Sequence, residues 1–167
     1  MKIVFVLVAC VVGGWYWFVG SRQISESDVR SYYTHELQFL DDGNSKEMCA
    51  SLDEKYSSRM IQVSAAGRLV EETDKTKSCQ AMEALFETVK KLNDQVGGGV
   101  VTNTEDNLDK IEISSDKKTA TASVRSVFKV GTEKVLMIKM TSNTTETFIK
   151  RNGKLLRLSA EGQTFIE

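Results

Sequence analysis

The sequence TFIKRNGKLLRL, residues 147–158, carries the strongest local structural signal in the chain. Two runs rich in β-branched and apolar residues flank the dipeptide Asn152-Gly153. A two-residue type I′ turn needs positive φ at both central positions, and Asn followed by Gly accepts this at the lowest steric cost. The stretch therefore predicts a β-hairpin.

Outward from this turn, residues 107–167 predict four successive strands in an antiparallel meander. In the second strand, small and apolar side chains alternate with polar ones, as in a sheet that packs on one side. The polar run 142–145 predicts a bend or bulge in the third strand, which is much longer than average. Register across the turn pairs Ile149 with Leu156 and Thr147 with Leu158. The expected strands are Leu108–Ile113, Thr119–Val130, Lys134 to about Arg151, and Lys154–Ile166.

Three helices are expected before the sheet. The first has Ser25 as its N-cap and ends at Asp41-Asp42-Gly43; the second is short and runs from Ser45 through Leu52. Ser78 is expected to cap the third, whose apolar residues recur on one face until Gly97-Gly98-Gly99 stops it. Residues 56–73 fit either a short hairpin broken at Ala65-Ala66-Gly67 or a continuation of the second helix, and the hairpin is favoured.

Composition indicates a single globular domain over residues 23–167. Hydrophobic residues make up 41% of the 167 residues and charged residues 27%, and the net charge of -1 gives no electrostatic reason to expect a nucleic-acid partner. The three-glycine run follows a helix and leads into a strand, the reverse of a phosphate-binding loop. No spacing of His, Cys and acidic residues suggests a metal, and we expect no cofactor.

Residues 1–22 contain an uncharged apolar run, residues 3–20, preceded by Lys2 and followed by Arg22. As a helix it would span roughly 27 Å, about the hydrocarbon thickness of a bilayer. Its aromatic residues 15–17 are typical of a membrane interface. An uncleaved anchor is favoured, with a cleaved signal peptide and a lipoprotein signal at Cys10 as alternatives. In each case we expect an extracytoplasmic domain, which in a bacterium is held in the inner membrane and faces the periplasm, or is secreted after cleavage.

The two other cysteines, Cys49 and Cys79, are expected to pair in an exported domain, because two cysteines alone in an oxidising compartment most simply form a disulfide. The alternative is a pair of buried thiols in a cytosolic protein. No CxxC spacing indicates redox chemistry.

Glu36 falls in the middle of the apolar face of the first helix, between Tyr33 and Leu40. A buried carboxylic acid beside Tyr32 or Tyr33 could transfer protons, which makes Glu36 the weak candidate for catalysis. The alternative is a purely structural role for Glu36 in an ion pair with a strand arginine, for which Arg125 and Arg157 are available. His35 lies beside the apolar face and is expected at its boundary or on the surface. Glu146 and Glu161 are expected to be solvated.

The order of these elements, with three glycines between the third helix and the sheet, resembles that of the nuclear transport factor 2-like (SnoaL-like, ketosteroid-isomerase-like) superfamily over residues 25–166. The resemblance implies an α+β domain, a cone in which N-terminal helices close one side of a curved antiparallel sheet, with room for a small apolar ligand. It also implies that a homodimer could form through the sheet. The pocket groups of the enzymatic members cannot be placed here. The ligand-pocket candidates are Tyr33, Glu36, Leu40, Arg125 and Arg157.

Two classes of function remain open. The favoured one is a membrane-tethered extracytoplasmic domain without catalysis that binds an envelope protein or a small apolar ligand; a secretion-assembly component of the VirB8 type is one version. The alternative is an isomerase- or dehydratase-like enzyme, and an immunity or inhibitor protein is a third. A binding domain predicts a filled or purely apolar interior. An enzyme predicts that Glu36 is buried, near a Tyr and without an Arg partner.

Overall fold

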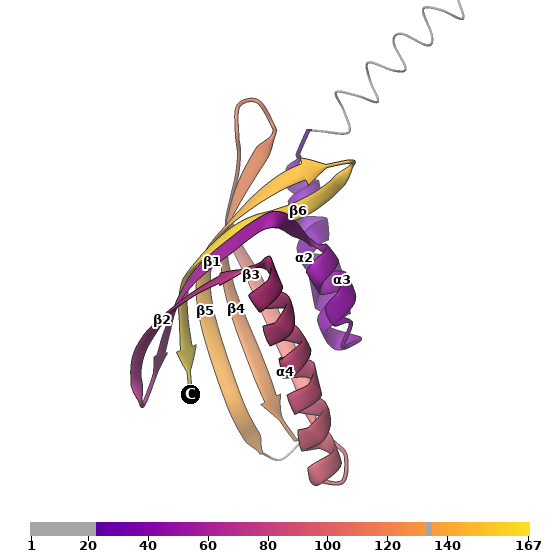
Figure 1. The fold of residues 1–167 in the computed structure, drawn as a ribbon, viewed down its shortest axis with the longest axis vertical. Helices are drawn as coiled ribbons and strands as arrows, with labels where there is room; N and C mark the ends of the chain where they lie inside the picture. The colour runs from indigo at the N-terminus through magenta and orange to yellow at the C-terminus, as the bar shows by residue number, and fades with distance from the viewer. Residues whose placement is uncertain (1–22, 133–134) are drawn as a thin grey trace, which may run out of the picture.

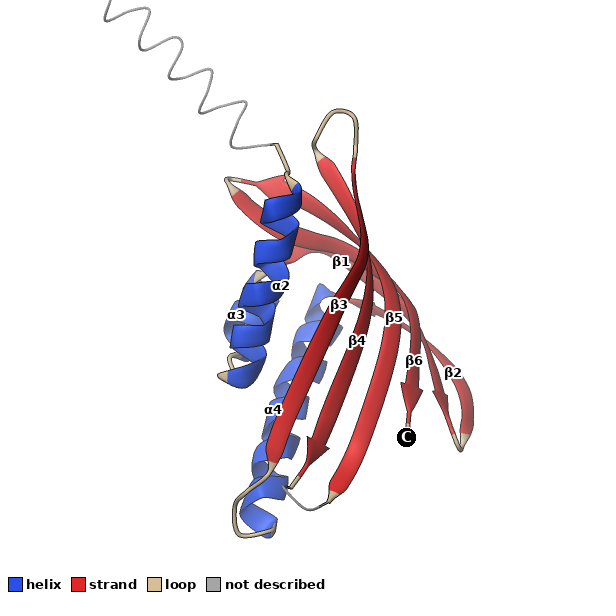
Figure 2. Ribbon diagram, turned by 180° about the vertical axis from the view of Figure 1, so that it is seen from behind, coloured by secondary structure: helices blue, strands red, loops and turns tan. Residues whose placement is uncertain are grey.

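A computed structural model describes residues 23–132 and 135–167. In this part of the chain three helices lie on one face of a curved, six-stranded sheet, as expected for an α+β cone (Figure 1, Figure 2). The helices are α2 (Glu26–Asp41), α3 (Ser45–Ala50) and α4 (Lys75–Gln95). The strands are β1 (Leu52–Ser64), β2 (Gly67–Asp74), β3 (Val101–Ile113), β4 (Thr119–Gly131), β5 (Leu136–Arg151) and β6 (Lys154–Ile166).

The strands follow the order β2-β1-β6-β5-β4-β3 in the sheet. Neighbouring strands are antiparallel except β1 and β6, which run parallel. The favoured hairpin in residues 56–73 is therefore present, and the helical alternative for this segment is wrong. Because β1 joins the meander through β6, the predicted hairpin and the predicted four-strand meander form one six-stranded sheet, which is mixed rather than purely antiparallel.

The Asn152-Gly153 turn forms as predicted, with φ of 51° and 79° at its two residues. Ile149 pairs with Leu156, but Thr147 pairs with Ser159 instead of Leu158. The reason is a register shift between Thr147 and Phe148. The bulge therefore does not lie in the polar run 142–145, as expected: the unpaired residue is Leu158 on β6, opposite Thr147 and Phe148.

Gly162 explains why the sheet can bend at that polar run. A Cβ added at Gly162 would lie 2.1 Å from the carbonyl oxygen of Asn143 and 2.8 Å from the Cα of Thr144. Such distances are far below van der Waals contact. Only glycine therefore allows β5 and β6 to approach each other this closely.

Helix α2 begins at the expected N-cap, Ser25, which forms a capping box with Asp28. The Ser25 hydroxyl accepts from the backbone N–H of Asp28, and the Asp28 carboxylate accepts from the backbone N–H of Ser25 at 2.9 Å. The helix buries its apolar face against the first half of β4 and the last residues of β5. The rings of Tyr32, Tyr33 and Phe148 meet edge to face, with centroids 4.9–5.9 Å apart. The core there consists of Ile24, Val29, Tyr32, Tyr33, Ala120, Ala122, Val124 and Phe148.

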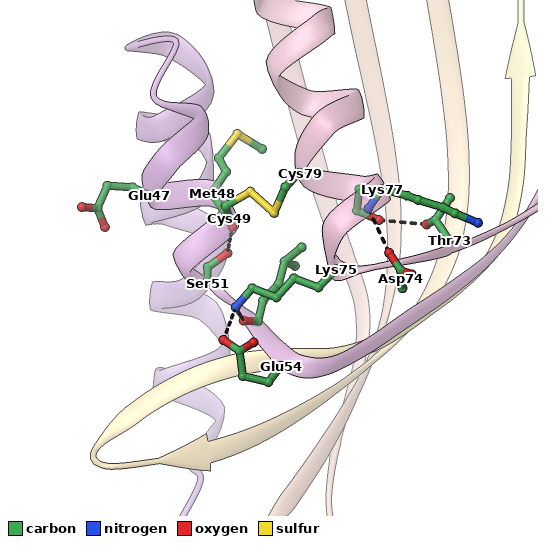
Figure 3. The surroundings of a disulfide bond; sticks show 12 residues. Glu47, Met48, Cys49, Ser51, Glu54, Thr73, Asp74, Lys75, Lys77 and Cys79 are labelled. Atoms are coloured by element: carbon green, nitrogen blue, oxygen red, sulfur yellow. Dashed lines mark hydrogen bonds and ion pairs between the residues drawn. A yellow bond between two sulfur atoms is a disulfide. The ribbon is translucent and has the colours of Figure 1, made fainter.

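Helix α4 is held mainly at its first turns. Asp74 rather than Ser78 is its N-cap: the Asp74 carboxylate accepts from the N–H of Lys77 at 2.9 Å, so the helix starts as soon as β2 ends. The expected disulfide between Cys49 and Cys79 joins α3 to α4 (Figure 3). Lys75 donates to the carbonyl oxygen of Leu52 at 2.9 Å and to Glu54 at 2.7 Å. The three glycines that end the helix all have positive φ.

Two other expected bounds need correction. The short helix α3 ends at Ala50 and β1 starts at Leu52, so Leu52 is a strand residue. Strand β3 starts at Val101, seven residues earlier than expected, because its polar first half still pairs with β4. No described helix is long and apolar enough to cross a bilayer. The predicted membrane segment at 3–20 lies outside the described residues.

Candidate functional site

A buried cluster of ionisable groups lies where α2 meets the inner face of the sheet, the face that carries the helices. Arg157 on β6 donates from Nη2 to Glu36 Oε2 on α2 at 2.5 Å. Its Nε lies 2.7 Å from Glu146 Oε2 on β5, but no acceptor stands in hydrogen-bonding geometry to this N–H among the described residues. The Glu146 contact is therefore an ion pair without a hydrogen bond. We call Glu36, Glu146 and Arg157 the ionic cluster.

The ionic cluster brings together two carboxylates and one guanidinium, whose side chains are only 9–13% exposed. Burial raises the pKa of Glu36; Arg157 opposes this shift and the charge of Glu146 adds to it. Burial alone would lower the pKa of Arg157, but the two carboxylates hold that pKa well above its usual value. Arg157 is thus permanently charged and already neutralised.

The two tyrosines of α2 are close to Glu36, but neither is bonded to it. The phenol of Tyr33 donates to Glu146 Oε2 at 2.7 Å, and the phenol of Tyr32 shares a hydrogen bond of 3.0 Å with Ser51. Burial is the main reason that the pKa of each phenol is raised. The guanidinium carbon of Arg157 lies 5.2 Å from the centre of the Tyr32 ring, within range of a cation–π contact. The alternative of an ion pair between Glu36 and a strand arginine is therefore the one observed, with Arg157 as the partner.

The other predicted site residues are spread over three places. Leu40 is half-buried and lines a cavity next to α4. Arg125 is exposed on β4, on the face away from the helices, because its neighbours Val124 and Ser126 alternate with it. Arg125 is therefore not a pocket residue. His35 is exposed, as expected, and lies beside the ring of Phe39.

Glu146 is the functional residue that sequence reasoning misplaced. It was expected to be solvated, but it is 7% exposed because Ala122 and Ala160 flank it on the inner face. The expected exposure of Glu161 is correct. The alternation in β5 could have located Glu146, since it shares a face with the apolar Phe148 two residues later.

Two cavities lie between α4 and the inner face of the sheet. The larger cavity, about 550 Å³, lies under the C-terminal half of α4 and reaches the end of α2; apolar side chains such as Leu40, Phe86 and Phe128 line it. The smaller cavity, about 280 Å³, lies under the first turns of α4, and Glu36, Met60 and Arg157 line it. The interior therefore has room for a ligand, as a ligand-binding cone requires, but its lining is mixed and not purely apolar as expected for a binding domain.

An outer groove of about 340 Å³ runs between α2, α3 and the β5–β6 turn. Tyr32, His35 and Lys154 are among its lining residues, and Glu36 borders both this groove and the smaller cavity. In the described residues no group of three His, Cys, Asp or Glu side chains could hold a metal ion.

No family model and no curated protein matches the sequence. Three solved structures illustrate what the fold is similar to. Aln2 from a Streptomyces species has 16% identity and a TM-score of 0.59, covering 85% of this chain and 94% of its own. A ketosteroid isomerase-like protein from Erwinia carotovora atroseptica has 9% identity and a TM-score of 0.54, covering 86% and 98%.

An NTF2-like protein of unknown function from Pseudomonas putida has 13% identity and a TM-score of 0.52, covering 83% of this chain and 84% of its own. At such identities the likeness concerns the fold and carries no information on activity. The helices, the curved sheet and these similarities together show that residues 23–167 have the NTF2-like fold.

Proposed function

We propose that this domain binds a small apolar ligand inside the cone, without catalysing a reaction on it. The observation that carries the proposal is the larger cavity beside α4. Its volume is in the range of roughly 300–1,000 Å³ that is typical of ligand pockets, and its lining combines apolar side chains with polar ones. None of the α4 side chains is fully buried, so its apolar face is available to a ligand.

The state of Glu36 supports binding over catalysis. An isomerase- or dehydratase-like mechanism needs a buried acid or base that is free to exchange a proton with the substrate. Glu36 is bonded to Arg157, and the phenols of Tyr32 and Tyr33 are bonded to Ser51 and Glu146. These groups hold one another in place, which suits a structural role at the closed end of the cone.

Fluorescence of the neutral dye N-phenyl-1-naphthylamine tests this proposal. The dye should bind one site per chain, with increased emission, and Val89→Trp should weaken its binding at least tenfold because the indole fills the larger cavity. Lys91→Trp is the matched control, since Lys91 lies on the exposed side of the same helix. Equal affinity of both variants and the unmodified chain would contradict the proposal.

We also propose that the domain faces an extracytoplasmic compartment and is tethered by residues 3–20. The apolar run and the Cys49–Cys79 bond support this extracytoplasmic location. After a carbonate wash the intact chain should stay with the membranes, whereas a mature form that begins near Ser21 would refute the anchor. Mass spectrometry without reductant should find Cys49 linked to Cys79 in protein from the envelope, and free thiols there would refute the oxidising compartment.

A further inference from the structure

We infer that the ligand of the cone is an apolar amine, bound as a cation, and that the charges around the two cavities disfavour carboxylates. This inference rests on the proposed function, because it assigns a chemical class to the same ligand. It is carried by the sign of the ionisable groups that line the cavities, by the C-terminal end of α2 beside the larger cavity, and by the two carboxylates that already contact Arg157.

The larger cavity combines an apolar wall with a negative rim. Among the described residues that line it, the ionisable side chains are four carboxylates and a single cation. Phe86 and Phe128 belong to the apolar wall, and aromatic rings can attract a cation. The ionisable residues are Asp41, Asp42, Glu83, Glu87 and Lys90.

The end of α2 adds to this negative potential. Leu40, Asp41 and Asp42 belong to its last turn and C-cap, and no basic residue stands in that turn. The carbonyl groups at a helix C-terminus carry a partial negative charge that favours cations. The cavity therefore faces a helix end whose charge is not compensated by a basic side chain of its own last turn.

The smaller cavity offers no free cation to an incoming anion. Its ionisable lining residues are Glu36, Glu71 and Arg157. Arg157 is already in contact with both Glu36 and Glu146. A ligand carboxylate would become a third anion around one buried guanidinium, which is unfavourable in a site of low dielectric.

The excess of negative charge belongs to the lining of the two cavities and not to the whole chain. The net charge of the protein is only -1. The two cavities together are lined by six carboxylates and two cations of the described residues. A ligand inside the cone therefore experiences a more negative potential than the composition of the chain suggests.

Displacement of N-phenyl-1-naphthylamine by three decyl compounds with different head groups tests the inference near neutral pH, about 7. Decylamine, decanol and decanoate share one apolar chain and differ in charge. We expect decylamine to bind on the order of tenfold or more tightly than decanoate, with decanol between them, and the difference to shrink as salt increases.

A charge-matched pair of double variants locates the effect. Glu83→Gln with Glu87→Gln, both exposed on α4 beside the larger cavity, should reduce the preference for decylamine several-fold. Glu112→Gln with Glu161→Gln changes the net charge equally on strand positions outside the cavities and should leave the preference unchanged. Equal or tighter binding of decanoate would overturn the inference while the proposed function stands. Failure of all three compounds to displace a bound dye would likewise overturn the inference alone, whereas failure of the dye itself to bind would overturn both.

Discussion

Helices α2 and α4 show two ways in which an amphipathic helix can meet the same sheet. Helix α2 buries Val29, Tyr32 and Tyr33, and its carboxylate Glu36 is bonded to Arg157. Helix α4 is longer but buries no residue completely, and two cavities separate parts of it from the strands. The closed half of the cone, formed by α2 with β4 and β5, is thus packed, while the open half under α4 is not.

Because the two halves are packed differently, we expect the closed half to determine stability and the open half to determine ligand binding. Buried aromatic side chains and a paired guanidinium hold the closed half together, so substitutions there should act on the free energy of unfolding. Side chains of the open half have lost less water-accessible area, so the same substitutions there should cost less stability and should act on ligand affinity instead.

The largest expected effect is the loss of the cation from the ionic cluster. Arg157→Met would leave Glu36 and Glu146 buried without a counterion, and we expect a loss of about 3–5 kcal/mol in the free energy of unfolding. Arg125→Met, on the exposed face of β4, should change it by less than about 0.5 kcal/mol. Urea denaturation measures both, and similar losses for the two variants would refute the structural role of Arg157.

A matched pair of phenylalanines compares the packing of the two halves. Phe148→Ala removes a ring that is fully buried in the closed half and should cost about 3–5 kcal/mol. Phe86→Ala removes a half-buried ring from the larger cavity and should cost only about 1–2 kcal/mol, because less area is re-exposed. Equal losses in urea denaturation would mean that the open half is packed as tightly as the closed one.

The Cys49–Cys79 disulfide is the covalent bond that fixes α4, in the open half, to α3. Replacing Cys49 and Cys79 by Ala should cost about 3–4 kcal/mol, since the bond closes a loop with a sequence separation of 30. Hydrogen exchange should then accelerate in α4 more than in α2. Uniform acceleration in both helices would show that α4 does not depend specifically on this link.

The pH dependence of stability should be small and opposite for two carboxylates of α2. The pKa of Glu36 is raised in the folded state, so its contribution is present below the unfolded value of about 4.5 and is lost as pH rises through the folded pKa. Burial opposes the shift of Asp28, but hydrogen bonds from Ser25 and Lys150 prevail and lower its pKa. Its contribution is present above about 3.8 and is lost as pH falls.

Two neutral variants check these signs by urea denaturation between acidic and neutral pH. Glu36→Gln should remove the part of the curve that falls with rising pH. Asp28→Asn should remove the part that rises. A change of the same sign in both variants would contradict the assigned pKa directions.

Local signals in the sequence were sufficient for most of the fold. The N-cap at Ser25, the three glycines that end α4 and the Asn152-Gly153 turn depend on neighbouring residues, and each formed as expected. The parallel pairing of β1 with β6 was not predictable in this way, because it joins segments about a hundred residues apart and depends on tertiary packing.

The candidate site was harder to predict because its residues come together only through tertiary packing. The position of Glu36 on the apolar face indicated its burial, and an arginine partner was among the alternatives. The choice between Arg125 and Arg157 required the register of β4 and β6, which sets the face that each side chain occupies. The face of Glu146 could be inferred from Phe148 two residues later, but its burial also depends on two alanines from neighbouring strands, which the sequence of β5 alone does not reveal.

The most direct measurement of a ligand site in the open half is a methyl NMR titration of the full chain with N-phenyl-1-naphthylamine. The naphthyl ring shifts only methyl groups close to it. The methyl signals of Leu40 and Val89, which line the larger cavity, should move, while those of Val124 in the closed half and Leu69 on β2 should stay in place. Shifts at Leu69 or Val124 without shifts at Leu40 and Val89 would contradict binding inside the cone.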